Sequence, residues 1–291
     1  MISLLRFIMT HPLNTKKISA IQRFIIWQFK ARIIKGVHVH PWIEGSSFYV
    51  KKGEHGLTSN IYTGLCEFSD MGFLLHLLKQ GDLFVDVGAN SGSYTILASA
   101  VSGAASLSIE PVPTTFSRLQ ANIELNSIQD LVVPLNIGIG QEAGLLNITL
   151  DHDSTNHFVI GSVSERTTPM RVRTLDEVVT GSPVLIKIDV EGWEINVLKG
   201  ASATLSDKNL LALIVEINES GVRFGFSDES ILNLLHSYGF YEHGYSPLTR
   251  EFWKISGKNM NENNTIFIRD LDQVVSRINL ARHINVFGTP L

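Results

Sequence analysis

The sequence predicts an α/β domain with a mainly parallel β-sheet that is covered by helices on both faces. From residue 69 onward, short apolar segments alternate with amphipathic ones, which is the pattern of repeated strand–helix units. The chain has 291 residues, of which 44% are hydrophobic, enough for one large domain or two small ones. No internal repeat or low-complexity tract interrupts the pattern. We divide the chain into a basic N-terminal segment with a hairpin, residues 1–60, and an α/β domain, residues 61–291.

The N-terminal segment contains an amphipathic helix, predicted at residues 18–34. Its apolar residues recur at helical spacing on one stripe, which comprises Ile18, Ile21, Ile25, Phe29 and Ile33. Residues 1–43 contain lysines and arginines but no aspartate or glutamate. We expect the helix to pack on the α/β domain with its basic face in water, or alternatively to lie on an anionic membrane surface. Residues 46–64, broken by Gly53 and Gly56, are predicted to form a short hairpin or loop.

The elements of the α/β domain follow in order. A helix at 69–82, with Ser69 as its N-cap and Gly81 as its end, precedes the first strand. The predicted strands cover residues 83–89, 105–111, 131–140, 184–191, 210–218, 240–245 and 264–270. The predicted helices between them cover residues 93–102, 114–126, 175–181, 193–200 and 228–239. Residues 144–174 are an inserted region of strands and loops, and residues 246–263 are a loop. Ligands of such sheets bind outside the carboxyl ends of the strands, so the residues after each strand are the candidates for function.

A glycine turn follows the first strand. Gly88 and Gly92 permit a tight turn and the close approach of a ligand to the backbone. The dinucleotide fingerprint G-x-G-x-x-G is not met, because Asn90 and Ser93 occupy its second and third glycine positions. Asp86, just before the turn, suits a cationic ligand better than a pyrophosphate. The turn therefore argues against a nicotinamide-dependent oxidoreductase, which is the rival enzyme class for this kind of sheet.

Glu110 ends the second strand, about twenty residues beyond the turn. At this place a carboxylate typically accepts hydrogen bonds from ribose hydroxyls. A cationic group and a ribose without a phosphate cradle describe S-adenosylmethionine. We therefore expect Asp86 and Glu110 to bind this cofactor.

Four segments in a fixed order carry a family resemblance. They are FVDVGANSGSYTILAS (84–99), SIEPVPTTFSRLQANIELN (108–126), VRTLDEVV (172–179) and LIKIDVEGWEINVLKGA (185–201). Together they resemble the FkbM-type family of class I, S-adenosylmethionine-dependent methyltransferases. The resemblance covers roughly residues 48–270. It implies a Rossmann-like sheet of seven strands whose last strand is antiparallel.

The resemblance also implies an enzyme that methylates a hydroxyl group, often on a sugar or a polyketide-derived product. It places four residues around the methionine portion of the cofactor, namely Asp86, Gly88, Asn90 and Gly92. Glu110 would contact the ribose, and the residues around Asn136 and Ile137 would lie near the adenine. The first 45 residues match nothing in the family, so acceptor specificity is expected in residues 1–60 and 144–174.

The fourth strand carries charges where an apolar run is expected. Because side chains alternate between the faces of a strand, Lys187, Asp189 and Glu191 form one polar row that runs to the strand's exit. Burying one charge alone is costly, so Lys187 is expected to have an acidic partner. The alternative roles are structural. Asp189 and Lys187 would then be an ion pair, and Glu191 would cap the following helix.

The hydroxyl acceptor must lose or share its proton during methyl transfer. In the first scheme, Asp189 or Glu191 accepts this proton, with His157 of the inserted region as a rival base. In the second, a divalent cation such as Mg²⁺ acidifies the hydroxyl, with Asp189, Glu216 and Asn218 as oxygen ligands. We favour the metal-free scheme and expect a chelator to leave turnover largely intact.

Other function classes have less support. The net charge of −4 gives no electrostatic case for a nucleic-acid partner. Amino-methylating nucleic-acid enzymes usually carry an Asn/Asp-Pro-Pro-aromatic motif after strand four, where this chain has DVEG. A non-catalytic S-adenosylmethionine-binding module with the same fold is a further alternative. With a single cysteine, no long apolar stretch and no secretory pattern at the start, we expect a cytoplasmic protein with a small-molecule or glycan acceptor. Peripheral membrane contact through residues 1–43 is the alternative to a helix packed on the domain.

Overall fold

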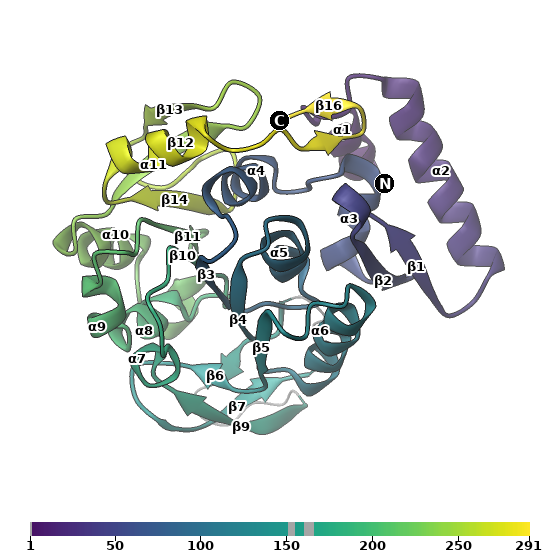
Figure 1. Cartoon of the computed structure of the whole chain (residues 1–291). Helices are drawn as coiled ribbons and strands as arrows, with labels where there is room; N and C mark the ends of the chain where they lie inside the picture. The colour runs from purple at the N-terminus through teal and green to yellow at the C-terminus, as the bar shows by residue number, and fades with distance from the viewer. Residues whose placement is uncertain (1, 151–154, 160–165) are drawn as a thin grey trace.

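The structure is a computed structural model that describes residues 2–150, 155–159 and 166–291 (Figure 1). Among these residues, the central β-sheet has eight strands. They are β3 (Leu83–Val87), β4 (Ala105–Ile109), β5 (Val132–Leu135), β10 (Leu185–Ile188), β11 (Ala212–Glu216), β12 (Tyr241–Ser246), β13 (Glu251–Lys254) and β14 (Asn264–Ile268). Their order in the sheet is β13-β12-β14-β11-β10-β3-β4-β5. The predicted α/β fold class is confirmed.

The strand directions match the predicted sheet, with one strand added. Strands β5, β4, β3, β10 and β11 are mutually parallel. Strand β14 is antiparallel to both of its neighbours, β11 and β12. The extra strand, β13, pairs with β12 inside residues 246–263, which the sequence predicted as a loop. It was missed because a four-residue strand at a sheet edge lacks the apolar run of a buried strand.

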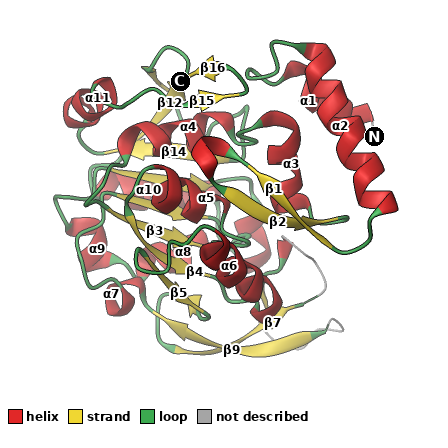
Figure 2. Cartoon of the chain, turned by 45° about the vertical axis from the view of Figure 1, so that its right-hand side comes forward, coloured by secondary structure: helices red, strands yellow, loops and turns green. Residues whose placement is uncertain are grey.

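Helices cover both faces of this sheet (Figures 1 and 2). One face carries α4 (Phe68–Leu77), α5 (Ser93–Ile96) with its π-helical continuation Leu97–Val101, and α11 (Leu271–Asn279). The core on the other face includes α7 (Leu175–Val178), α8 (Glu194–Lys199), α9 (Ser202–Ser206) and α10 (Asp228–Ser237). Helix α6 (Pro113–Leu125) packs near β5. Side chains alternate between the two faces of a strand, so successive residues are buried in the cores on opposite faces of the sheet, as Leu185 and Ile186 are.

The inserted region forms a second sheet beside the first. Its strands are β6 (Gly138–Ile139), β7 (Gly144–Thr149), β8 (Phe158–Val159) and β9 (Thr167–Arg173), in the order β6-β9-β7-β8. The predicted single strand at 131–140 is therefore wrong. The chain leaves the central sheet after Leu135 and joins the second sheet at Gly138.

The N-terminal part differs from its prediction in two places. It comprises α1 (Ile2–Thr10), α2 (Lys17–Ile33), β1 (Val37–Pro41), β2 (Ser47–Lys51) and α3 (His55–Thr63), with a 3-10 turn at Ile43–Gly45. The hairpin is β1–β2, and the second half of the predicted hairpin segment is helix α3. Helix α2 is where the sequence predicted it, but its apolar stripe does not pack on the domain. The side chains buried there are Ala20, Trp27 and Ala31.

The remaining elements are short. Helix α4 begins one residue earlier than predicted, with Glu67 at its N-cap, and the Ser69 hydroxyl donates to Glu262 instead of capping. The helix ends at Leu77, before Gly81, whose φ of +90° serves the turn into β3. A 3-10 turn spans Ser220–Phe224, and β15 (Asn285–Val286) pairs with β16 (Thr289–Pro290). No helix in the described ranges combines the length and the apolar character needed to cross a bilayer.

Candidate active site

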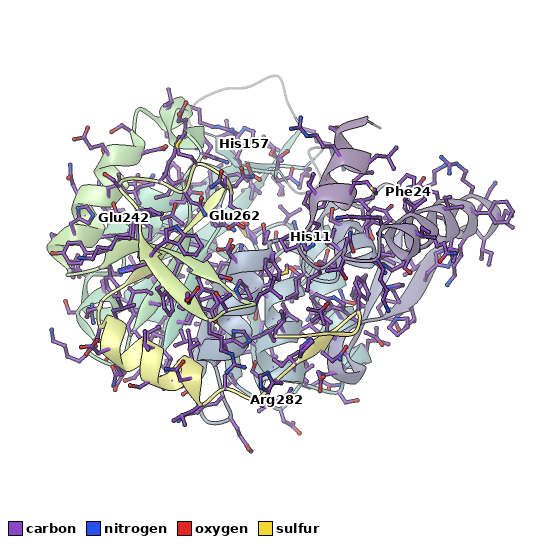
Figure 3. All side chains as sticks on the ribbon, turned by 90° about the horizontal axis from the view of Figure 1, so that it is seen from above. His11, Phe24, His157, Glu242, Glu262 and Arg282 are labelled. Atoms are coloured by element: carbon purple, nitrogen blue, oxygen red, sulfur yellow. The ribbon has the colours of Figure 1, made fainter. Side chains whose placement is uncertain are left out.

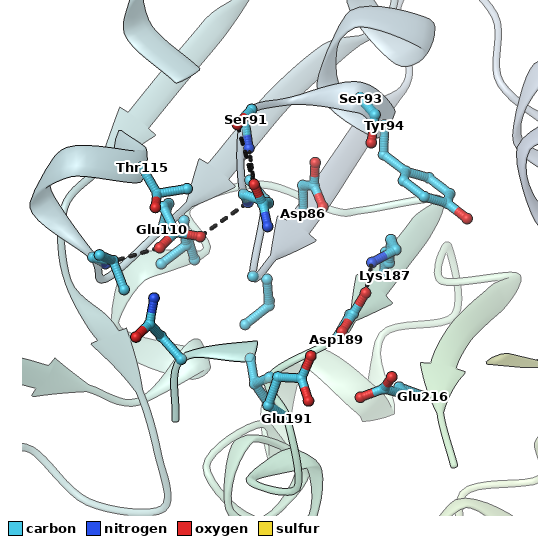
Figure 4. A pocket seen from close by; sticks show the side chains of 18 of the residues that line it. Asp86, Ser91, Ser93, Tyr94, Glu110, Thr115, Lys187, Asp189, Glu191 and Glu216 are labelled. Carbon is cyan, nitrogen blue, oxygen red and sulfur yellow. Dashed lines mark hydrogen bonds and ion pairs between the residues drawn. The ribbon is translucent and has the colours of Figure 1, made fainter. Parts of the chain in front are cut away.

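A pocket of about 410 Å³ lies at the carboxyl ends of β3, β4, β10 and β11 (Figure 4). This is the edge at which an open α/β sheet binds ligands, and the volume is that of a small-molecule site. The inserted region lines it through Phe158 of β8 and the preceding His157, and the N-terminal segment lines it through Phe7 and Ser59. The pocket is therefore built jointly by the central sheet, the insertion and the N-terminal segment.

The glycine turn after β3 is required by packing. Gly88 has a φ of +82°, and a Cβ there would lie 1.8 Å from the carbonyl oxygen of Asp189. Gly92 has a φ of +91°, and its Cβ would lie 2.7 Å from Cδ1 of Leu119. From the sequence, both glycines are expected to permit a tight turn and the close approach of a ligand, and their positive φ values confirm the turn. The structure shows that their nearest neighbours are the chain after β10 and helix α6.

Glu110 is held at the end of β4 by two backbone donors. Its carboxylate accepts from the N–H of Asn90 at 2.9 Å and from the N–H of Val112 at 2.8 Å. Burial raises the pKa of Glu110 to about 7, although both hydrogen bonds act to lower it. Asn136 does not line the pocket. Its side chain donates to the carbonyl oxygens of Glu110 and Pro111, so it holds the loop that carries Glu110.

Asp86 is buried at the end of β3 and has one oxygen without a protein partner. Its Oδ2 accepts from the Thr95 hydroxyl at 2.8 Å, while Oδ1 has no hydrogen bond to any described residue. Burial raises the pKa of Asp86 to about 6, against the opposing charge of Lys187, its register partner on β10. A buried carboxylate oxygen of this kind fits a cationic or hydrogen-bond-donating ligand.

Lys187 has the acidic partner that its buried position predicted. Its Nζ lies 2.7 Å from Oδ2 of Asp189 and 4.7 Å from the centre of the Tyr94 ring, and the residue is 3% exposed. Burial lowers the pKa of Lys187, but the carboxylates of Asp189, Glu67 and Asp86 outweigh it and leave the pKa raised. Lys187 therefore fixes the orientation of the Asp189 carboxylate just beyond the carboxyl end of β10.

Glu191 is free of the capping role considered for it. Strand β10 ends at Ile188, and Glu191 has a φ of +54°, a conformation that is unusual for a residue with a side chain. Helix α8 has no side-chain cap; Glu194, its first residue, holds the loop before it, because its Oε1 accepts the N–H groups of Val190 and Gly192 at 3.1 and 3.0 Å. Glu191 lines the pocket near Asp189 and Glu216 (Figure 4). Burial and neighbouring carboxylates raise its pKa to about 7.

Three carboxylates converge at this end of the pocket. One oxygen each of Asp189, Glu191 and Glu216 lies within 4.8 Å of the other two. Glu216 ends β11, is 7% exposed, and its Oε2 has no partner among the described residues. Burial, followed by the charges of the neighbouring carboxylates, raises the pKa of Glu216 to about 10. Asn218 is outside this group, since its side chain is exposed and its Oδ1 accepts from the N–H of Ser220.

Two further residues with ionisable side chains line the pocket. His157 lines the pocket from the inserted region, and its backbone N–H donates to the Thr149 hydroxyl at 3.0 Å; Figure 3 labels it. Glu67 lines the pocket from the N-cap of α4, and burial raises its pKa. Sequence reasoning missed Glu67 because an acid at a helix start is an ordinary capping pattern.

A comparison with known families shows which family the chain belongs to. A family described as "Methyltransferase FkbM domain" matches residues 86–242 of this chain. The chain belongs to the FkbM methyltransferase family. This is the family that the four sequence segments resemble, and a nicotinamide-dependent oxidoreductase has no support among these matches.

Similar proteins match parts of this chain. The hexuronic acid methyltransferase AglP of Haloferax volcanii is 31% identical over 153 residues, which are 50% of this chain and 59% of that protein. The chain thus spans less than two thirds of that relative. The solved structure of methyltransferase FkbM from Methylobacillus flagellatus KT is 16% identical, with a TM-score of 0.44, over 64% of this chain and 43% of that one. The structure of M. jannaschii TYW2 with AdoMet is 12% identical, with a TM-score of 0.42, over 82% of this chain and 90% of that one.

Proposed function

We propose that this methyltransferase transfers a methyl group from S-adenosylmethionine to a hydroxyl oxygen of a sugar or glycan. The observation that carries the proposal is the pair of buried carboxylates, Asp86 and Glu110, at the ends of two adjacent parallel strands. The sugar acceptor is supported by the likeness to AglP, which is named for hexuronic acid.

The residues at the cofactor end of the pocket fit S-adenosylmethionine. The oxygens of Glu110 each accept one backbone N–H and keep a lone pair for a ribose hydroxyl. The unpartnered oxygen of Asp86 lies in the same pocket and favours a positively charged group. When bound, the cofactor supplies a methyl group on a positively charged sulfur.

The residues at the other end of the pocket handle the acceptor. Asp189 is held by Lys187, so its second oxygen is available to accept the hydroxyl proton. Glu191 lies beside it as a further carboxylate, and His157 lines the pocket from the inserted region. We propose Asp189 and Glu191 as the catalytic carboxylates, with His157 as a contact to the acceptor. Residues 1–60 contribute Phe7 and Ser59, which supports a role of this segment in shaping the acceptor site.

The test combines cofactor binding with methyl transfer. Calorimetry should show binding of S-adenosylmethionine and none of NAD. A panel of sugars and uronic acids should include an acceptor that is methylated on oxygen as S-adenosylhomocysteine forms. Glu110→Ala should weaken cofactor binding by roughly 10–100-fold, the range for losing hydrogen bonds to a charged group. Glu124→Ala, an exposed glutamate of α6, is the matched control and should change nothing.

Two results would contradict the proposal. Binding of NAD without binding of S-adenosylmethionine would refute the cofactor. Tight S-adenosylmethionine binding without methylation of any hydroxyl in a broad panel would favour a non-catalytic binding module.

A further inference from the structure

The pocket is lined by many more acidic than basic side chains. Among the described residues that line it, six are carboxylates, namely Glu67, Asp86, Glu110, Asp189, Glu191 and Glu216. Lys187 is the only lysine or arginine in that described lining. S-adenosylmethionine would add one net positive charge. Because unpaired buried charge is costly, the remaining excess calls for a further cation or for bound protons.

The excess is concentrated where three carboxylates converge. Asp189, Glu191 and Glu216 each place one oxygen within 4.8 Å of the others, a spacing that one small cation can bridge. The unpartnered Oε2 of Glu216 is an independent sign of a missing partner, because buried carboxylate oxygens are otherwise hydrogen-bonded. The left-handed backbone of Glu191 is an unfavourable conformation that keeps its side chain in this group.

We propose that Asp189, Glu191 and Glu216 bind one divalent cation of the Mg²⁺ or Mn²⁺ type. Such ions take about six oxygen ligands, so three protein carboxylates leave positions for water and for an oxygen of the acceptor. The site differs from the set expected from the sequence, because Glu191 takes the place of Asn218. It also reverses the preference for a metal-free scheme that the sequence alone suggested. Its role in holding the acceptor rests on the proposed function, whereas binding of the ion does not.

The test measures the ion directly, without cofactor or acceptor. Titration of the full chain with MnCl₂, followed by electron paramagnetic resonance, should show one bound Mn²⁺ per chain that excess MgCl₂ displaces. Glu216→Gln should weaken this binding by at least roughly tenfold, a loss that even outer-shell partners of a metal cause. Glu229→Gln, an exposed glutamate on α10, should bind Mn²⁺ like the wild type.

Failure of this site can be told apart from failure of the proposed function. No saturable Mn²⁺ binding, or equal binding by Glu216→Gln and the wild type, would overturn the site. Sugar methylation at an undiminished rate in EDTA would overturn the ion's role in holding the acceptor and would leave the function standing. Bound Mn²⁺ that Glu216→Gln loses would support the site, even if no sugar were methylated.

A second inference rests on helix α2, far from these carboxylates in sequence. Five large apolar side chains of this helix, Ile18, Ile25, Ile26, Phe29 and Ile33, are 56–75% exposed. At 3.6 residues per turn, they centre roughly 170° around the helix from the side that packs on the body. Figure 3 shows α2 projecting from the molecule, and Figure 2 shows it at the outer edge. The apolar stripe is therefore directed away from the domain.

The charges around this stripe identify its partner. Lys30 and Arg32 lie in the last turn of α2, Lys16 and Lys17 lie at its start, and Lys35 follows it. All five are exposed, and residues 1–43 contain no acidic side chain. An apolar helix face flanked by basic residues is complementary to a bilayer with anionic headgroups.

We infer that α2 lies on an anionic membrane surface. In flotation assays, the full chain should bind vesicles of phosphatidylcholine with 30% phosphatidylglycerol and should bind pure phosphatidylcholine vesicles at least roughly tenfold less well. The double variant Ile25→Ser/Phe29→Ser should lose at least roughly tenfold in binding, because two large apolar side chains no longer enter the lipid. Leu145→Ser, which changes an equally exposed residue on β7, is the control and should bind normally.

Other occupants of this face would give different results. A dimer in solution that the double variant converts to monomer would show that a second copy covers the stripe. Equal binding to both kinds of vesicle, or to neither, would also overturn the inference.

Discussion

Replacing Lys187 by methionine should remove a large part of the stability of the fold. The Lys187–Asp189 pair lies at 2.7 Å, where the attraction is about 6 kcal/mol at an effective dielectric constant of about 20. Desolvation offsets much of this attraction in the intact pair, but a buried charge left without its partner costs about 3–5 kcal/mol. Lys187 is 3% exposed and also faces Asp86 across the strand register. Lys187→Met should therefore lower the free energy of unfolding in urea by about 3–5 kcal/mol at pH 8.

Two further variants make this prediction specific. The double variant Lys187→Met/Asp189→Asn should recover at least about 2 kcal/mol of this unfolding free energy, because the Asp189 carboxylate no longer lacks its partner. Lys258 also bridges two carboxylates, those of Glu219 and Asp228, but at the surface, so Lys258→Met should cost about 1 kcal/mol or less. Equal losses for Lys187→Met and Lys258→Met, or no recovery in the double variant, would refute the reasoning.

Three further predictions concern the pocket. Asp189→Asn should retain S-adenosylmethionine binding but lower kcat by about a hundredfold or more, and unchanged turnover would reduce Asp189 to a structural role. Gly88→Ala should lower the free energy of unfolding by more than the roughly 1–2 kcal/mol that a left-handed alanine costs, because its Cβ would lie 1.8 Å from the carbonyl oxygen of Asp189. Thermal unfolding measures this loss, and a Tm close to that of the wild type would contradict the prediction. The pKa of Glu110 is raised from about 4.5 in the unfolded chain to about 7 in the fold. The folded state therefore binds the carboxyl proton of Glu110 more tightly than the unfolded state does. The stability that this proton contributes is lost as the pH rises from about 4.5 to about 7. Relative to wild type, Glu110→Gln should therefore gain up to about 3 kcal/mol in unfolding free energy between pH 4 and pH 8 without cofactor, and a difference that does not vary with pH would count against the assignment.

The order of strands and helices could be predicted from the sequence because it depends on local patterns. Apolar runs bounded by glycine turns mark the strands, and the parallel arrangement places their carboxyl ends at one edge. This was enough to bring Asp86, Glu110 and Asp189 to one pocket and to require an acidic partner for Lys187. The weakly patterned parts failed: β13 was read as a loop and α3 as half of a hairpin.

The aim of individual side chains could not be predicted, because it depends on loop conformations and on neighbours distant in the sequence. Asn136 follows a strand as expected but turns to the carbonyls of its neighbouring loop. Glu191 enters the acidic group only through its left-handed backbone, and Glu216 joins it because β11 lies beside β10.

Helix α2 shows what the sequence determines and what only the tertiary structure determines. The 3.6-residue period was sufficient to predict the helix and to group its isoleucines and Phe29 on one stripe. The period says nothing about which side of a helix meets the rest of the protein. The tertiary structure decided this, because Ala20 and Ala31 are small enough to let the helix approach closely and Trp27 fills the space between them, leaving the isoleucine stripe to the outside.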